Sequence, residues 1–153
     1  MNHLLMSWAL TAFLPYSAQA LQLEMSRGEL CQYSDLVVVG EVTSGETRWA
    51  SNAPEGAIER LRWVHVDDVV RGQASGTLEV VLPGGTMGDL THWVEDVPEL
   101  MTNARYLLFL HEIDGALQII GGERGAVRIA RSETEQGERL DALLQELEVC
   151  RAR

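Results

Sequence analysis

The sequence YLLFLHEIDGALQII, residues 106–120, contains two apolar runs on either side of a turn signal. Tyr106–Leu110 is the most apolar candidate strand in the chain, and Leu117–Ile120 is the second run. The pair Asp114-Gly115 stands between them, and Asp-Gly between apolar runs is the strongest short-range signal for a β-hairpin. This stretch therefore predicts two antiparallel strands in a β-rich domain.

Four further segments have the composition or the alternation of strands. They are Leu36–Val42, Ile58–Val70, Thr77–Leu82 and Ala126–Ile129. The alternation in the second of them breaks at Asp67-Asp68, which predicts a bulge or bend. Because the turns between the strands are too short for crossover connections, we expect most strands to be antiparallel.

A helix is predicted at each end of this set of strands. Ser26-Arg27-Gly28-Glu29 fits a capping box, which predicts a short helix from Arg27 to about Ser34. Ser132-Glu133-Thr134-Glu135 can cap a second helix. Its apolar stripe at helical spacing consists of Leu140, Leu143, Leu144 and Leu147. We therefore expect a mainly β (α+β) fold, a small antiparallel barrel with a short N-terminal helix and a C-terminal amphipathic helix. An open antiparallel sheet covered by the C-terminal helix is the alternative.

Two polar segments, residues 45–56 and 86–103, are predicted to be long loops. They carry Trp49, Met87 and Trp93, which form the candidate binding surface. Long loops on a rigid barrel are where such folds place binding surfaces, and tryptophan is enriched at protein interfaces. The alternative is that these tryptophans plug the ends of the barrel.

The N-terminal residues 1–20 have the pattern of a secretory signal peptide. An apolar run, Leu4–Leu14, precedes Ala18-Gln19-Ala20, a small-x-small site for cleavage near Ala20. The run is about half as long as a membrane-spanning helix needs to be. The residues before it depart from the signal-peptide pattern in one respect, because they contain no Lys or Arg. We expect a secreted or periplasmic protein with one domain, residues 21–153. The alternative is an uncleaved helix that packs on the core.

Export would change the chemistry of the two cysteines, Cys31 and Cys150. A pair of cysteines in an oxidising compartment favours a disulfide, which here would close nearly the whole mature chain. Two buried free thiols are the alternative. Neither cysteine has a Cys or His at ligand spacing, so a zinc site is not expected there.

The charge of the chain excludes some classes of partner. Twelve Arg and no Lys stand against 23 Asp and Glu, which gives a formal net charge of -11 at pH 7. A nucleic-acid binder needs a basic face, and docking on anionic lipid needs one as well. With 46% hydrophobic residues the chain can still bury a core.

No motif in the sequence selects a catalytic or cofactor site. There is no Gly-x-Ser-x-Gly elbow, and a chain without Lys cannot form a phosphate-binding loop of the Gly-x-x-x-x-Gly-Lys type. The His/carboxylate clusters, His65-x-Asp67-Asp68 and His111-Glu112-x-Asp114, offer fewer than three converging ligands for zinc. We therefore expect no metal, no cofactor and no enzymatic activity.

One acidic pair lies beside an aromatic residue. Glu95-Asp96, near His92 and Trp93, could serve as an acid/base pair for a sugar substrate. The preferred interpretation is a solvated loop that Trp93 and Leu100 anchor to the core.

Three stretches together resemble the netrin-like domain, the OB-type barrel that tissue inhibitors of metalloproteinases share with several secreted modules. They are CQYSDLVV at residues 31–38, the alternating segment 58–72 that ends in Val-Val-Arg-Gly, and Arg-Tyr-Leu-Leu at 105–108 followed by Asp114-Gly115. Their order and spacing also resemble those of uncharacterised secreted bacterial proteins of similar size. The resemblance implies an OB-type barrel over about residues 31–129.

The departures from that family bear on function. The inhibitors begin their mature chain with Cys-x-Cys and chelate the protease zinc with its first residue, whereas the predicted mature start here is Leu21-Gln22-Leu23. Gly121 stands near the place of another family cysteine. We therefore expect a binding module for an unknown protein or small ligand, with no nucleic acid and no membrane span in the mature chain. A protease inhibitor or protease-associated module is one alternative, and a small secreted hydrolase whose site is not evident from the sequence is another.

Overall fold

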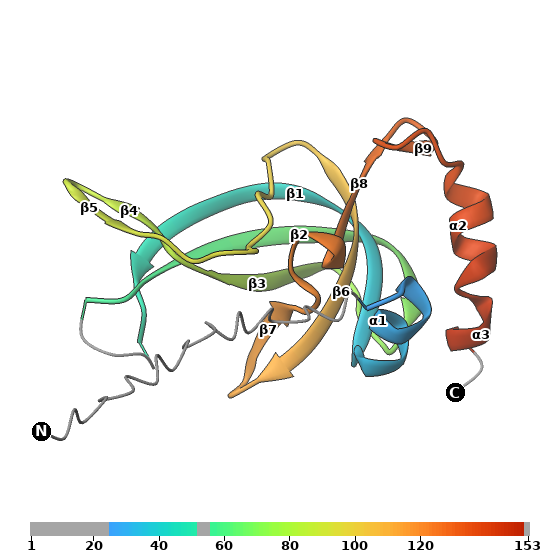
Figure 1. The fold of residues 1–153 in the computed structure, drawn as a ribbon, viewed down its shortest axis with the longest axis horizontal. Coiled ribbons are helices and arrows are strands. Elements are labelled where there is room, and N and C mark those ends of the chain that lie inside the picture. Colours follow the sequence, from blue (N-terminus) through green and yellow to red (C-terminus); the bar gives the residue numbers. More distant parts are fainter. Residues whose placement is uncertain (1–24, 52–55, 152–153) are drawn as a thin grey trace, which may run out of the picture.

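The computed structural model of the chain describes residues 25–51 and 56–151, and its fold is mainly β with short helices near both ends (Figure 1). The elements in order are α1 (Arg27–Tyr33), β1 (Leu36–Trp49), β2 (Ile58–Arg71), β3 (Thr77–Pro83), β4 (Gly85–Met87), β5 (Leu90–His92), β6 (Arg105–Ile113), β7 (Ala116–Ile119), the 3-10 turn η1 (Gly122–Gly125), β8 (Ala126–Ala130), β9 (Glu133–Thr134), α2 (Leu140–Glu146) and α3 (Glu148–Arg151). The predicted signal peptide and its cleavage site lie outside the described residues.

Seven strands form one sheet in the order β1-β2-β3-β7-β6-β8-β9, and β1 pairs with β6 as well as with β2. Every pairing is antiparallel, as predicted, except that of β3 with β7, which is parallel and joins only two residue pairs. The small hairpin β4–β5 is a separate two-stranded sheet. The predicted β-rich fold with helices near both ends is therefore confirmed in outline.

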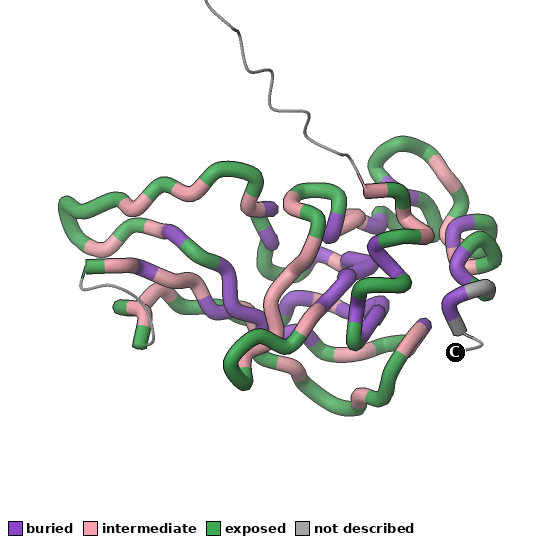
Figure 2. The backbone as a smooth tube through the Cα atoms, turned by 60° about the horizontal axis from the view of Figure 1, so that its bottom comes forward, coloured by how far each residue is buried: buried purple, intermediate pink, exposed green. Residues whose placement is uncertain are grey.

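Residues 36–40 of β1 and 106–110 of β6 are buried on both faces, which explains why these stretches are continuous apolar runs rather than alternating ones. Val37 and Phe109 face a core that also contains residues of α1, α2 and α3. Val38 and Leu108 face a second core on the other side of the sheet, which β2 and β3 also line. Figure 2 shows the buried stretches concentrated towards the middle of the molecule and its helix-bearing end.

The bulge predicted at Asp67-Asp68 is confirmed. Val39 pairs with Asp68 and the next residue of β1, Gly40, pairs with Val66, so Asp67 is the extra residue of the bulge. Gly40 permits the close approach of the two strands, because a Cβ atom there would lie 2.6 Å from the carbonyl oxygen of His65. Both strands curve strongly as they cross the molecule (Figure 1).

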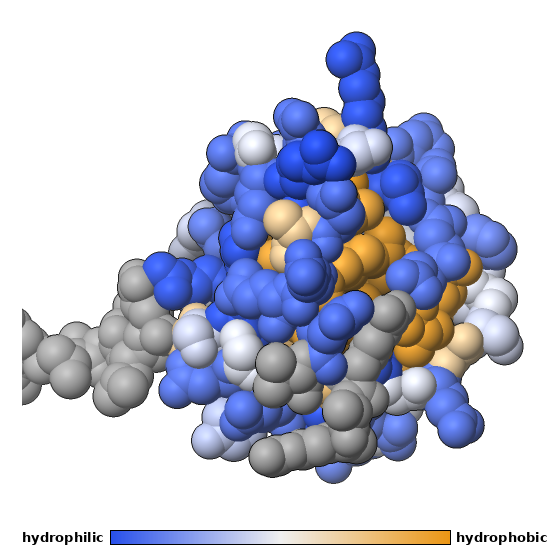
Figure 3. All heavy atoms as spheres, turned by 90° about the vertical axis from the view of Figure 1, so that its right-hand side faces the viewer, coloured by the Kyte–Doolittle hydropathy of each residue, from blue (hydrophilic) through white to orange (hydrophobic). Residues whose placement is uncertain are grey.

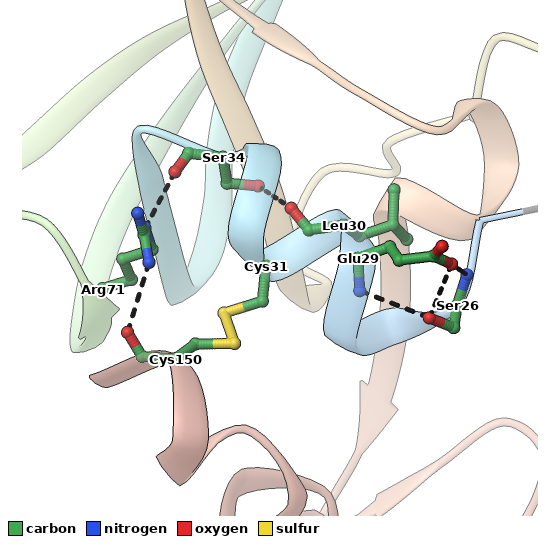
Figure 4. The surroundings of a disulfide bond; sticks show 7 residues. All are labelled: Ser26, Glu29, Leu30, Cys31, Ser34, Arg71 and Cys150. Atoms are coloured by element: carbon green, nitrogen blue, oxygen red, sulfur yellow. Dashed lines mark hydrogen bonds between the residues drawn. A yellow bond between two sulfur atoms is a disulfide. The ribbon is translucent and has the colours of Figure 1, made fainter. Parts of the chain in front are cut away.

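A disulfide between Cys31 and Cys150 joins α1 to α3, with Cα atoms 6.1 Å apart and a sequence separation of 119 (Figure 4). Arg71, at the end of β2, donates from Nε to the carbonyl of Ser34 (2.9 Å) and from Nη1 to that of Cys150 (3.3 Å). One guanidinium and one covalent bond thus hold both ends of the described chain against the sheet. Figure 3 shows this end of the molecule, where a group of apolar residues is surrounded by hydrophilic residues.

Helix α1 begins with the predicted capping box (Figure 4). The Ser26 hydroxyl accepts from the amide of Glu29 (3.3 Å), and the Glu29 carboxylate accepts from the amide of Ser26 (2.8 Å) and from its hydroxyl (2.7 Å). These hydrogen bonds, first that of the Ser26 amide, lower the pKa of Glu29 from its ordinary value of 4.5.

Replacing Ser26 by alanine is expected to lower the free energy of unfolding by about 1 kcal/mol at pH 7, because the amide of Glu29 loses its acceptor. Alanine also removes the hydrogen bond from the Ser26 hydroxyl to the Glu29 carboxylate, one of the bonds that lower the pKa of Glu29. That bond stabilises the fold above pH 4.5 and loses this effect as the pH falls through the folded-state pKa. The difference between wild type and Ser26→Ala should therefore narrow in acid. Urea unfolding at pH 7 and pH 3 measures both values, and a difference that grows in acid would contradict the prediction.

Three sequence predictions about local structure are wrong. Residues 45–49 are not loop but the last part of β1, and the predicted loop 86–103 contains the hairpin β4–β5. The C-terminal helix begins at Leu140 rather than next to Ser132, because the backbone of Thr134 turns to bond Glu138 and Gly137 adopts a positive φ. The leucine stripe of that helix is confirmed, since Leu143 and Leu147 are buried.

Candidate binding surface

The three residues of the predicted surface lie on or beside the hairpin β4–β5 and the end of β1. Trp49 is the last residue of β1 and is 50% exposed, and Met87 ends β4 and is partly buried. Trp93 follows β5 directly and is 80% exposed. Leu90, at the start of β5, is half exposed as well and was not among the predicted residues.

Hydrogen bonds bring the two tryptophan-bearing segments to the same end of the sheet. Ile58 is the strand partner of Trp49, and its amide donates to Nδ1 of His92 (3.2 Å), the residue before Trp93. The carbonyl of Ile58 accepts from the amide of Gly84 (2.8 Å). Figure 1 shows the hairpin projecting at the left, at the opposite end from α2 and α3.

Gly85 explains how closely the hairpin approaches the sheet. It has a φ of +144°, and a Cβ atom there would lie 3.1 to 3.2 Å from side-chain atoms of Thr47, Ile58 and Arg60. A larger residue would push the base of the hairpin away from β1 and β2. The glycine thereby fixes where Leu90 and Trp93 are presented.

A cleft of about 530 Å³ opens at this end of the sheet, between β2, β3 and the turn that joins β6 to β7. Its lining combines apolar residues with charged ones: Arg48, Ala50, Ser51, Ala57, Ile58, Glu59, Glu79, Val81, Pro83, His92, Ile113, Asp114, Gly115, Ala116, Leu117 and Gln118. Arg48 forms an ion pair with Glu59 (2.7 Å), and this hydrogen bond is the main reason that the pKa of Arg48 is raised. The cleft therefore contains one neutralised cation and further carboxylates.

The segment between Trp93 and β6 folds over the inner face of β2. Arg62 donates from Nε to the carbonyl of Leu100 (3.1 Å), Arg60 pairs with Glu99, and Leu100 is fully buried. Burial also lowers the pKa of Arg62. The prediction that Leu100 anchors this segment is confirmed. The same prediction for Trp93 is wrong, because Trp93 points into solvent.

A second cavity, of about 730 Å³, lies beside the start of α1, the 98–101 segment, η1 and β8. Two arginines in its wall form ion pairs, Arg27 with Glu138 (2.7 Å) and Arg128 with Glu135 (2.9 Å). Glu99 and Glu123 line the same cavity.

The residues weighed for chemistry are dispersed. Asp67 pairs with Arg105 (2.8 Å), while Nδ1 of His111 lies 2.8 Å from Asp35. Asp96 accepts from the amide of Glu123 (3.1 Å). Within residues 25–51 and 56–151 no group of three His, Cys, Asp or Glu residues is close enough to hold a metal ion.

The hydrolase alternative predicted His92 beside Glu95 or Asp96 and a buried serine. In the structure, Ser34 is buried at the end of α1 and donates to the carbonyl of Leu30, whereas His92 is the last residue of β5. The Nδ1 atom of His92 is engaged by the amide of Ile58. The inhibitor alternative predicted a projecting edge that starts at Leu21, which lies outside the described residues.

A scan against protein-family models finds no match for this chain, and a search of curated proteins finds no similar sequence. The resemblance to netrin-like domains therefore stays a prediction. In the described part of the chain, every helix is too short or too polar to cross a membrane.

Proposed function

We propose that this protein is a secreted, non-enzymatic binding module that recognises its partner with the end of the sheet carrying Trp49, Leu90 and Trp93. The observation that carries the proposal is the exposure of these side chains around the hairpin β4–β5, with Trp93 at 80%. Large apolar side chains gathered on a surface mark interaction sites, and tryptophan is the most enriched residue among interface hot spots. The disulfide supports the exported location, since such bonds persist in oxidising compartments.

The strand pairings support an OB-type barrel as the framework of this module. The pairings of β1 with β2, β2 with β3, β3 with β7, β7 with β6 and β6 with β1 form a closed cycle. OB-type barrels bind ligands on strands 2 and 3 and on the loops at one end of them. The 530 Å³ cleft lies between β2, β3 and the β6–β7 turn, and its place at strands β2 and β3 supports this framework.

Replacing Trp49 and Trp93 together by alanine is expected to weaken partner binding about 30-fold or more, because a buried hot-spot residue contributes about 2 kcal/mol or more to binding. Trp93 is mostly exposed, so its replacement alone should change the free energy of unfolding by less than about 0.5 kcal/mol. Affinity capture of residues 21–153 from the secretome of the source cells identifies the partner, and titration of that partner measures the loss.

Tyr33→Ala is the matched control, because Tyr33 is a 67% exposed aromatic residue on α1, at the other end of the molecule. It should capture the same partner with unchanged affinity. Equal capture by wild type and by the double tryptophan variant would refute the proposed binding surface.

A further inference from the structure

We infer that the 530 Å³ cleft accepts an arginine or lysine side chain from an extended, basic segment of the protein partner. The inference rests on the proposed function and names the chemistry that its binding end recognises. Three features of the cleft carry it: carboxylates that outnumber its one arginine, apolar walls and a strand edge next to them.

The charges of the cleft select a cation. The one arginine in its lining, Arg48, is held by Glu59 and also attracted by Glu79, so one cation faces three carboxylates in the cleft. Glu79 and Asp114 are both exposed and face the same cleft from β3 and from the β6–β7 turn. The net charge of -11 adds a long-range attraction for basic partners.

The apolar walls suit the aliphatic part of a long basic side chain. Val81 is nearly buried in the cleft, Leu117 lies on the neighbouring strand, and Ile113 is 41% exposed at the rim. Arginine and lysine pack their methylene groups on such surfaces while the charged end reaches polar partners. A simple anionic surface lacks this combination.

The edge of β3 favours a peptide over a small amine. Strand β3 pairs with β7 only through Val80 and Val81, so residues 77–79 have no strand partner on that edge within the described chain. An extended peptide can add its backbone to such an edge and direct alternate side chains into an adjacent pocket. Glu79 lies on this stretch, whose other edge pairs with β2.

The test uses residues 21–153 and the peptide acetyl-Val-Arg-Val-Arg-Val-amide, titrated by calorimetry at low and at physiological salt. We expect saturable binding. The same peptide with citrulline in place of arginine, which keeps the shape and removes the charge, should bind at least tenfold more weakly. The variant Glu79→Gln/Asp114→Asn should also bind the arginine peptide at least tenfold more weakly. Asparagine is suitable at position 114 because the residue has a φ of +52°, which Asn tolerates.

A control variant, Glu133→Gln/Glu148→Gln, removes the same charge on β9 and α3, away from the cleft, and should bind within twofold of wild type. An equal loss in both double variants would overturn the inference, because it would reflect net charge alone. Equal binding of the citrulline peptide would overturn it as well. Competition by 1,4-diaminobutane at the same concentration as the peptide would assign the cleft to small amines instead.

Capture of the natural partner by both double variants distinguishes the proposed binding surface from the proposed basic segment. If the tryptophan double variant loses the partner while Glu79→Gln/Asp114→Asn retains it, the binding surface stands and the basic segment is refuted. If both variants retain the partner, the binding surface itself is refuted.

Discussion

Replacing Cys31 and Cys150 by alanine is expected to lower the free energy of unfolding by about 4 kcal/mol. The disulfide closes a loop with a sequence separation of 119 residues, and chain-entropy reasoning assigns about 4–5 kcal/mol to a loop of that length. Both cysteines are buried, and α2 and α3 are too short to persist without tertiary contacts. Urea unfolding followed by circular dichroism measures the loss.

Wild-type protein unfolded in the presence of dithiothreitol is the control. It should unfold at nearly the same urea concentration as the double alanine variant, because both lack the covalent loop. An unchanged midpoint under reducing conditions would show that the two helices are held by packing and by Arg71 alone.

Replacing Phe109 by alanine is expected to cost about 4 kcal/mol of unfolding free energy. Phe109 lies in the middle of β6, is fully buried, and belongs to the core that also contains Cys31, Leu143 and Leu147. Truncating a buried phenylalanine removes apolar contacts and leaves a cavity, which typically costs 3–5 kcal/mol. Thermal and urea unfolding measure the change.

Tyr33→Ala also serves as the control for Phe109, since it removes an aromatic ring of similar size from an exposed position. Its effect should remain within about 0.5 kcal/mol. Similar losses for the two variants would mean that the core beneath the helices is not packed around β6.

The hairpin β6–β7 could be predicted because its turn residues and the apolar run before them both indicate the same structure. Asp114 and Gly115 both adopt positive φ, of +52° and +80°, which is what a two-residue turn between twisted strands needs. The apolar run before them is buried on both faces. The bulge in β2 could be predicted for a similar reason, because a break in alternation records a change of register directly in the sequence.

The second half of β1 could not be predicted, because its neighbours are not apolar. The partners of Gly45 and Thr47 on β2 are Arg62 and Arg60. Polar residues therefore occupy both faces of this part of β1, and the alternation of apolar and polar residues that marks a strand is missing. A Cβ atom at Gly45 would lie 2.6 Å from the Arg62 guanidinium, a tertiary contact that the local sequence does not record.

The candidate surface could be predicted only in part. Long polar segments and tryptophans are visible in a sequence, but their exposure depends on what fills the core, and here Leu100 fills it in place of Trp93. Strands of three residues such as β4 and β5 are too short for a periodic pattern. The cleft is formed by segments from five parts of the chain, so no local motif marks it.

The order in which the two cysteines appear has a consequence for biosynthesis. Whether the chain emerges from a ribosome or from an export channel, Cys31 comes out first and waits for its partner until a further 119 residues have followed. During that interval its thiol is open to mixed disulfides with oxidising enzymes or with neighbouring chains. The Cys31–Cys150 disulfide can therefore form only after residue 150 has emerged.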